Sequence, residues 1–355
     1  MRAEEMWQTS TGAGMTIAVV DSGVDPELGD LQGQVLPGED FSGIEGGAHS
    51  DYDGHGTSMA VLIAGTGKSN GGAGSYGLAP GVKILPLRVI NSHAPATRVL
   101  PGDSVSSAIR YAADSDAKII NISMGGPAES SQQAEAVDYA ISKGKLIFAA
   151  VGNSGHKENR IEFPAAYPGV VGVAAVDQNI KATEESQRGA QVDLAAPGAN
   201  MVSTCKGGTG LCRGHGTSDA TALASASAAL IWSAHPDWTA NQVLRVLINT
   251  AGGPKSGEKR SDTIGYGVVR PRIALQNAGD PGPPNVSPLP ELAGASATPA
   301  PTAEGAPQAG ADKSDDNAVL SKRNVLAVSI ALAAVAVVGV PLLVFATRRR
   351  RHLPR

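Results

Sequence analysis

The chain has 355 residues, a formal net charge of −4 and 42% hydrophobic residues, which fits a globular α/β core with flexible ends. Its only run of basic residues lies near the carboxyl end, and this argues against a nucleic-acid partner. The region before residue 279 is too long for a minimal module and predicts one large domain.

Apolar runs typical of strands alternate with segments typical of helices from residue 16 to residue 250. The expected strands are residues 16–20, 83–89, 118–123, 145–151 and 170–176. The expected helices are residues 57–64, 104–115, 131–143, 220–233 and 239–250. This alternation predicts an α/β fold in which a mostly parallel sheet lies between two layers of helices.

The first expected strand ends in a carboxylate. Asp21 follows a short apolar run that is rich in Val and Ile. Such a run is typical of a buried strand, and open α/β sheets bind ligands at the carboxyl ends of their strands. Ser22 and Gly23 are also typical of a turn, so Asp21 taken alone fits a helix cap or a turn as well.

The pentapeptide Gly-His-Gly-Thr-Ser occurs twice, at residues 54–58 and 214–218. Serine is a nucleophile when a histidine takes its proton, and a carboxylate such as Asp21 fixes the tautomer of that histidine. Either copy could supply the base or the nucleophile. The first copy opens the expected helix at 57–64, whereas the second precedes a long run of small residues at 220–233.

Two further segments follow buried strands and suit a substrate-binding site. Asn153 lies among glycines after the strand at 145–151, where its amide suits either an oxyanion donor or a plain turn. An extended edge after the strand at 118–123 can pair with a peptide backbone. The residues of that edge are Ser123, Met124, Gly125 and Gly126.

Four blocks resemble the subtilisin-like serine proteases and occur in the order of that family. They are residues 19–23, 55–57, 150–155 and 216–218, with weaker matches at 121–126 and 265–269. The resemblance covers residues 6–276 and implies a subtilisin-like three-layer fold.

The same resemblance implies a role for each candidate residue. Asp21, His55 and Ser218 would form the catalytic triad, in that chain order. Asn153 and the backbone N–H of Ser218 would form the oxyanion hole. His215 would be a loop residue near the cleft, and Ser58 an ordinary helix residue.

One position beside the candidate nucleophile departs from the family pattern. The residue after Ser218 is Asp219, where the family usually has an apolar residue, and the proline that usually follows is absent. A carboxylate at this place would favour protonated His55 and weaken the base at neutral pH. We expect activity, with Asp219 as the feature that restricts it.

The composition changes beyond the expected peptidase domain, residues 1–278. Residues 279–324 are rich in Pro, Ala and Gly and contain no aromatic residue, so they are expected to form a disordered linker. Residues 325–346 carry no charge, and 22 residues are enough for one transmembrane helix. Four arginines at 348–351 follow this segment.

The positive-inside rule places the basic tail, residues 347–355, in the cytoplasm. The expected localisation is therefore a single-pass membrane protein with an extracytoplasmic catalytic domain. No apolar signal segment precedes Met15, so we expect an export signal upstream of Met1.

Cys205 and Cys212 are the only cysteines of the chain. They lie seven positions apart around a glycine pair, just before Ser218, and predict a small hairpin disulfide. An extracytoplasmic domain permits this oxidation. Two cysteines without a nearby histidine pair do not suit a metal site, and no metal or cofactor is expected.

The layout of domain, linker, single span and basic tail resembles the mycosins, membrane-anchored proteases linked to type VII secretion in actinobacteria. The resemblance implies a serine endopeptidase with a peptide or protein substrate and with the type VII machinery as a partner. A degenerate protease that acts as a membrane scaffold is the alternative, and Asp219 favours it. A serine esterase has little support, because no Gly-x-Ser-x-Gly elbow surrounds Ser218.

Overall fold

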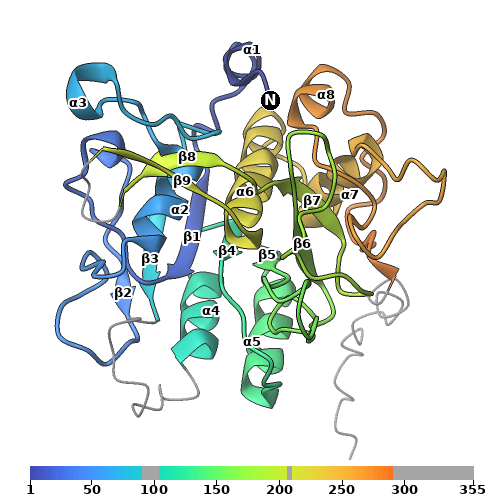
Figure 1. Cartoon of the computed structure of the whole chain (residues 1–355), viewed down its shortest axis with the longest axis horizontal. Coiled ribbons are helices and arrows are strands. Elements are labelled where there is room, and N and C mark those ends of the chain that lie inside the picture. The colour runs from blue at the N-terminus through green and yellow to red at the C-terminus, as the bar shows by residue number, and fades with distance from the viewer. Residues whose placement is uncertain (90–103, 206–209, 291–355) are drawn as a thin grey trace, which may run out of the picture. The chain divides into compact units, whose positions relative to one another are not determined.

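The computed structural model describes residues 1–89, 104–205 and 210–290, whose arrangement is shown in Figure 1. Seven strands form a sheet in the order β2-β3-β1-β4-β5-β6-β7. They are β1 (Thr16–Asp21), β2 (Glu39–Asp40), β3 (Lys83–Arg88), β4 (Ile119–Ile122), β5 (Leu146–Ala150), β6 (Val170–Val176) and β7 (Leu194–Pro197). Every neighbouring pair is parallel, as the sequence predicts.

Helices cover both faces of the sheet, which confirms the predicted three layers. One face carries α2 (His55–Ala64), α6 (Thr217–Ala234), α7 (Ala240–Thr250) and α8 (Pro271–Gln276). The other face carries α4 (Ser104–Asp114) and α5 (Ser131–Ser142). Short helices are α1 (Ala3–Trp7), α3 (Ser69–Gly72) and a 3-10 turn at Gly29–Leu31.

The central strands are buried on both faces, so they consist of apolar residues without polar alternation. In β1, Ile17 and Val19 pack into the core beneath α6, whereas Ala18 and Val20 pack into the core beneath α4 and α5. This double burial fixes the register of β1 and therefore the position of Asp21 at its end.

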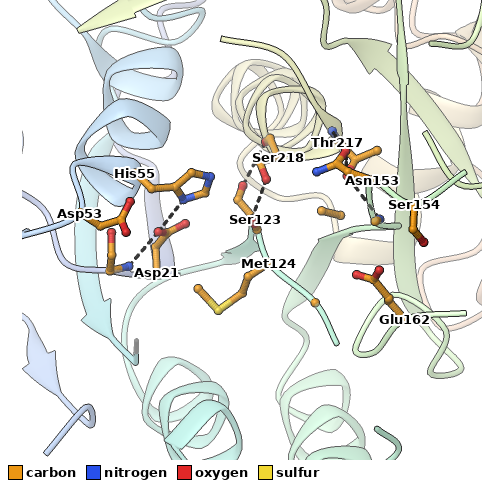
Figure 2. Close-up of a pocket in the computed structure, with 14 residues that line it drawn as sticks. Asp21, Asp53, His55, Ser123, Met124, Asn153, Ser154, Glu162, Thr217 and Ser218 are labelled. Carbon is orange, nitrogen blue, oxygen red and sulfur yellow. Dashed lines mark hydrogen bonds and ion pairs between the residues drawn. The ribbon is translucent and has the colours of Figure 1, made fainter. Parts of the chain in front are cut away.

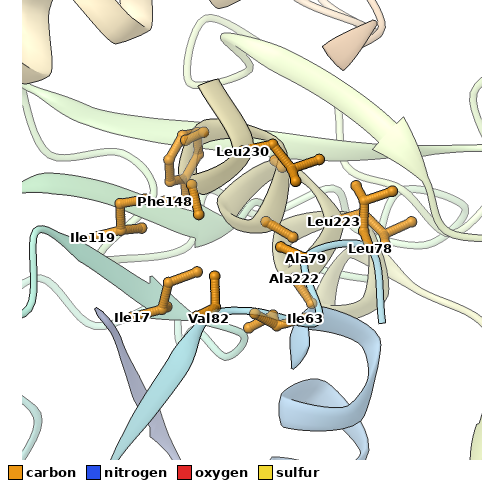
Figure 3. Packing of buried hydrophobic residues seen from close by; sticks show 14 of the residues in the cluster. Ile17, Ile63, Leu78, Ala79, Val82, Ile119, Phe148, Ala222, Leu223 and Leu230 are labelled. Carbon is orange, nitrogen blue, oxygen red and sulfur yellow. The ribbon is translucent and has the colours of Figure 1, made fainter. Parts of the chain in front are cut away.

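Helix α6 lies at the centre of the first core. Leu223 and Leu230 of this helix belong to the same buried cluster as Phe148 and Ile119 of the sheet (Figure 3). Most of its other residues are Ala, Ser and Thr, and small side chains let a helix approach its neighbours closely on all sides. The helix is longer than expected, because it begins at Thr217 rather than at Ala220.

Helix α7 agrees with the helix expected at 239–250, and Thr239 caps its start. The side chain of Thr239 accepts a hydrogen bond from the backbone N–H of Gln242, and the Gln242 side chain accepts one from the Thr239 backbone. This reciprocal pair satisfies two N–H groups that a helix start leaves without partners.

The bounds of several short elements were not expected from the sequence. The strands β2 and β7 have two and four residues, too few for a periodic pattern to distinguish them from loop. An antiparallel hairpin of β8 (Met201–Thr204) and β9 (Leu211–Gly214) lies outside the main sheet. The cysteine pair predicts a hairpin here, but the partly exposed strands have no hydrophobic pattern that gives their bounds.

The segment after α8 corrects the predicted start of the linker at residue 279. The guanidinium group of Arg245 donates hydrogen bonds to the carbonyls of Pro281, Pro283 and Val286, and Leu289 is buried. These contacts hold residues 281–289 against α7, although their composition is typical of a disordered chain.

None of the helices in the described ranges is long and apolar enough to cross a membrane. The predicted span at 325–346 and the basic tail at 347–355 lie outside the described residues, as does the predicted linker beyond residue 290.

Candidate active site

A cleft of about 420 Å³ opens where the central strands end. It is bordered by the end of β1, by the segments that follow β4 and β5, and by the starts of α2 and α6 (Figure 2). Every candidate triad and substrate residue borders it except Gly126. This position agrees with the rule that ligands bind at the carboxyl ends of parallel strands.

Asp21 and His55 form a close pair in this cleft. The Nδ1 atom of His55 lies 2.7 Å from Oδ1 of Asp21, which is fully buried. Because a carboxylate only accepts hydrogen bonds, Nδ1 carries the proton. The neutral ring then has its lone pair at Nε2, as a general base requires.

The negative charge of Asp21 controls the protonation of the His55 ring. The Asp21 carboxylate raises the pKa of His55 to about 9, although desolvation lowers it. Asp53 and Asp219 also raise this pKa. The imidazolium form of His55 is therefore strongly stabilised, and the neutral base prevails only under alkaline conditions.

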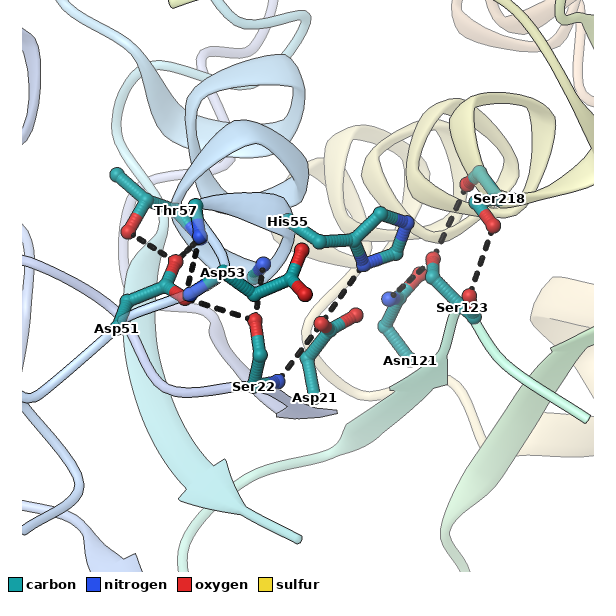
Figure 4. A network of polar contacts seen from close by, with 11 residues as sticks. Asp21, Ser22, Asp51, Asp53, His55, Thr57, Asn121, Ser123 and Ser218 are labelled. Atoms are coloured by element: carbon teal, nitrogen blue, oxygen red, sulfur yellow. Dashed lines mark hydrogen bonds and ion pairs between the residues drawn. The ribbon is translucent and has the colours of Figure 1, made fainter. Parts of the chain in front are cut away.

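Asp51 organises the start of α2, a role that the sequence did not reveal. Its Oδ2 accepts hydrogen bonds from both N and Oγ1 of Thr57, and its Oδ1 accepts from the Ser22 hydroxyl and the Gly54 backbone (Figure 4). The carboxylate links the residue after Asp21 to the first turn of the helix that carries His55. It therefore helps to hold the pair in register.

Ser218 lies in the first turn of α6, where backbone N–H groups have no partner within the helix. Its hydroxyl donates a 2.8 Å hydrogen bond to the carbonyl of Ser123, and the Ser123 hydroxyl donates back to the Ser218 carbonyl (Figure 4). No hydrogen bond joins Ser218 to His55 among the described residues. A rotation of the Ser218 side chain is needed to direct its proton toward Nε2.

Asn153 follows β5 and faces the start of α6. Its Oδ1 accepts hydrogen bonds from N and Oγ1 of Thr217, at 2.9 and 3.1 Å. These two bonds fix which end of the amide faces Thr217, and they leave Nδ2 as a donor at the border of the cleft. This orientation suits the predicted oxyanion role, and Thr217 is a residue that the sequence did not single out for it.

The segment predicted to bind substrate follows β4 and is only partly available as an edge. Gly126 exchanges two backbone hydrogen bonds with Phe163, at 2.8 and 3.0 Å. Ser123, Met124 and Gly125 border the cleft instead. A substrate strand therefore has three residues of this segment along the cleft.

Asp219 is buried beside the candidate nucleophile, and its Oδ2 has no hydrogen-bond partner among the described residues. Burial raises the pKa of its carboxyl group to about 6, although His55 and His215 lower it. Asp219 is therefore ionised at the alkaline pH at which the neutral form of His55 prevails.

The other histidine and the other serine of the two pentapeptides, His215 and Ser58, do not line the cleft. His215 is exposed, with Nδ1 3.5 Å from Oε1 of Glu185. The Ser58 hydroxyl donates to Oγ of Ser203 in β8. Both positions agree with the minor roles expected for these two residues.

Cys205 and Cys212 form a disulfide bond across the β8–β9 hairpin, as predicted. β9 leads through Gly216 to the start of α6, so the bond closes the hairpin from which the Ser218 segment continues. Within the described residues, no group of three or more His, Cys, Asp or Glu side chains is suited to bind a metal ion.

Glu162 also borders the cleft, although its place in the sequence does not predict this. It lies on a loop after β5, and only the folded chain brings it beside Gly125 and Gly152. No local motif in the sequence marks this approach.

The sequence and the fold are both similar to those of known proteases. Residues 12–269 match the model of the subtilase family, peptidase S8. Subtilisin E of Bacillus subtilis (strain 168) is 35% identical over 246 residues, which cover 69% of this chain and 62% of subtilisin E. Thermitase of Thermoactinomyces vulgaris is 35% identical over 251 residues, which cover 71% of this chain and 86% of thermitase.

Among solved structures, the chain is similar to MycP1, described as a serine protease and an essential component of the type VII (ESX-1) secretion system. The TM-score is 0.68 at 31% identity, and the match covers 78% of this chain and 86% of that one. The family model matches more than half of the chain. The chain therefore belongs to the subtilase family, the subtilisin-like serine endopeptidases.

Proposed function

We propose that Asp21, His55 and Ser218 are the catalytic triad of an endopeptidase. The observation that carries this proposal is the 2.7 Å contact between Nδ1 of His55 and the buried Asp21, in a cleft that Ser218 also borders. The contact gives His55 the tautomer of a general base, and Ser218 is the hydroxyl at the start of the facing helix.

The reaction begins when Ser218 Oγ attacks the carbonyl carbon of the scissile peptide bond and His55 Nε2 takes the hydroxyl proton. The new oxyanion accepts hydrogen bonds from Nδ2 of Asn153 and from the backbone N–H of Ser218. The C–N bond then breaks as His55 returns the proton to the leaving amine. Water, deprotonated by His55, releases the acyl group and restores Ser218.

We test this by labelling the protein with a fluorophosphonate, which reacts with activated serines, between pH 6 and pH 9. We expect labelling of the wild type and of Ser58→Ala, and none of Ser218→Ala. Labelling should increase with pH, because His55 must lose the proton that Asp21 stabilises. Unchanged labelling of Ser218→Ala would contradict the assigned nucleophile.

We also propose that the protein is anchored in the membrane with its catalytic domain outside and that it acts with a type VII secretion system. The uncharged segment at 325–346 and the four arginines after it support the anchor. The similarity to MycP1, named as a component of such a system, supports the partner.

Membrane fractionation tests the anchor. The full chain should sediment with membranes and resist extraction by carbonate, whereas a chain that ends at residue 324 should be released. Extraction of the full chain by carbonate alone would contradict a spanning segment. Loss of secretion when the gene is deleted, restored by the wild-type protein, would support the partner.

A weakly active scaffold is the second candidate. The buried Asp219 and the bond from Ser218 to the Ser123 carbonyl favour it, since both oppose activation of the serine. Under this alternative, the Ser218→Ala protein would restore secretion as well as the wild type does.

A further inference from the structure

The carboxyl group of Glu162 lies in the cleft, away from the proposed triad. Figure 2 shows this side chain turned toward Asn153 and Ser154, on the opposite side of the drawn site from Asp21 and His55. Glu162 has no part in the mechanism proposed above. A carboxyl group in this place is therefore available to contact the substrate.

Two glycines make room for this carboxyl group. A Cβ atom on Gly152 would lie 2.7 Å from Oε1 of Glu162, and one on Gly125 would lie 3.1 Å from Oε2. Any larger residue at either position would push the carboxyl group aside. The backbones of the segments after β4 and β5 therefore leave a slot between Gly125 and Gly152. The carboxyl group of Glu162 borders this slot.

The charge of Glu162 is poorly compensated within the protein. Its Oε1 accepts a 2.7 Å hydrogen bond from the side-chain amide of Gln187, a neutral donor. Burial raises the pKa of Glu162, and the bond from Gln187 opposes this rise. A cation close to the carboxylate would offset the cost of its desolvation.

The described lining of the cleft offers no such cation. Among the described residues that line it, the charged or titratable ones are Asp21, Asp53, His55 and Glu162, and none is Lys or Arg. None of the ion pairs of the described residues includes Glu162; the nearby Arg160 pairs with Glu158. The missing positive charge would thus have to come from the substrate.

We propose that Glu162 selects substrates with a lysine or arginine side chain immediately before the scissile bond. The inference rests on the proposed function, because the side chain that enters the slot is defined by the carbonyl that Ser218 attacks. An ammonium or guanidinium group would reach the Glu162 carboxylate between Gly125 and Gly152. There it would give the carboxylate a charge-assisted hydrogen bond, which is stronger than the bond from the neutral amide of Gln187.

Peptide p-nitroanilides that differ only in the last residue, Lys, Arg, Met or Glu, test the preference. For the intact protein, kcat/KM should be highest with Lys and Arg. In Glu162→Gln, kcat/KM for Lys and Arg should fall about 10- to 100-fold while the value for Met changes little, because a hydrogen bond to a charged group is lost. Equal selectivity of the two proteins would overturn the proposal.

Glu158→Gln is the matched control, because it removes the same charge from an exposed residue outside the cleft. It should keep the Lys and Arg preference of the wild type. Fluorophosphonate labelling of Glu162→Gln at the wild-type rate would establish that the variant is folded and that its serine is intact.

Binding of p-aminobenzamidine, followed by its fluorescence, separates this inference from the proposed function. The amidinium group should bind the wild type and Ser218→Ala equally, and Glu162→Gln about 10- to 100-fold more weakly. Binding through Glu162 without hydrolysis of any peptide would refute the endopeptidase and keep the cation slot. Hydrolysis with no preference for Lys or Arg would keep the endopeptidase and refute the slot.

Discussion

The two copies of Gly-His-Gly-Thr-Ser have the same sequence, but a helix begins at a different residue in each. In residues 54–58 the helix α2 begins at the histidine, whereas in residues 214–218 the helix α6 begins at the threonine. The shift of two residues places His55 in a helix against Asp21 and leaves His215 exposed in the approach to α6. The residues that precede each copy, a loop or a β-hairpin, therefore decide which side chain enters the cleft.

The threonines of the two copies make the same pair of hydrogen bonds with different partners. Thr57 donates from N and Oγ1 to the Asp51 carboxylate, and Thr217 donates from N and Oγ1 to the Asn153 amide oxygen. A carboxylate has no donor, whereas an amide that accepts through its oxygen keeps an NH₂ group. The cleft thus has its amide donor beside the copy that carries Ser218.

The largest difference between the copies should appear in their histidines. His55→Ala should lower kcat on the order of 10⁶-fold, the loss that the equivalent removal causes in subtilisin, because Ser218 loses its base. His215→Ala should keep kcat within a few-fold, as expected for an exposed side chain. Steady-state hydrolysis of one peptide substrate measures both, and similar losses would show that the two roles are not separated.

Replacement of Asn153 tests whether the amide donor distinguishes the partner of Thr217 from the carboxylate partner of Thr57. Asn153→Asp can still accept from Thr217 but has no donor for the oxyanion, so kcat should fall about 10²- to 10³-fold or more, with the unfolding temperature nearly unchanged. KM should change little. A loss that appears only in KM would assign Asn153 to ground-state binding.

The residue after each pentapeptide differs as well, being Met59 in one and Asp219 in the other. Asp219→Asn removes a charge that raises the pKa of His55, so the rising limb of kcat/KM should move from about pH 9 toward lower pH. The shift should be small, because Asp21 is the main cause of the raised pKa. A shift toward higher pH would contradict this account.

The same variant should change how stability depends on pH. The pKa of Asp219 is about 6 in the folded protein and about 3.8 when unfolded, so the folded state binds the proton more tightly and loses stability as pH rises between these values. Asp219→Asn should therefore be more stable above pH 6, by on the order of 3 kcal/mol, and similar below pH 4. Urea unfolding at pH 4 and pH 8 measures the difference.

The β8–β9 hairpin touches both copies, since Ser203 of β8 bonds with Ser58 and β9 leads to Ser218. Replacing Cys205 and Cys212 by serine should lower the free energy of unfolding by about 2 kcal/mol, given the short loop that the bond closes. Turnover should change little. A loss of labelling in the still-folded variant would mean that the disulfide positions Ser218.

The sequence was sufficient to predict the helices and strands whose hydrophobic patterns extend over many residues. Strands such as β6, with seven buried residues, and helices such as α5 lie within one or two residues of their expected bounds. The position of Asp21 followed from the same reasoning, because a strand end in a parallel sheet has a defined edge. The disulfide was foreseen from two cysteines around a glycine pair.

What the sequence could not supply depends on contacts between distant segments. Glu162 enters the cleft only because Gly125 and Gly152 leave space for it, and neither lies near it in the chain. The bond of Ser218 to Ser123 depends on how α6 packs over β4. Residues 281–289 have the composition of a linker, but Arg245 donates hydrogen bonds to three of their backbone carbonyls and holds them against the domain.

If the chain is anchored as proposed, the hydrogen bonds of Arg245 to residues 281–286 would determine where mechanical load enters the domain. A pull on the chain from beyond residue 290 acts first on the buried Leu289 and on the carbonyls that Arg245 holds, and then on α7. The cleft is on other elements, so the proposed triad would keep its geometry until the hydrogen bonds of Arg245 break. A tethered domain built in this way can be strained at its attachment while its cleft keeps its geometry.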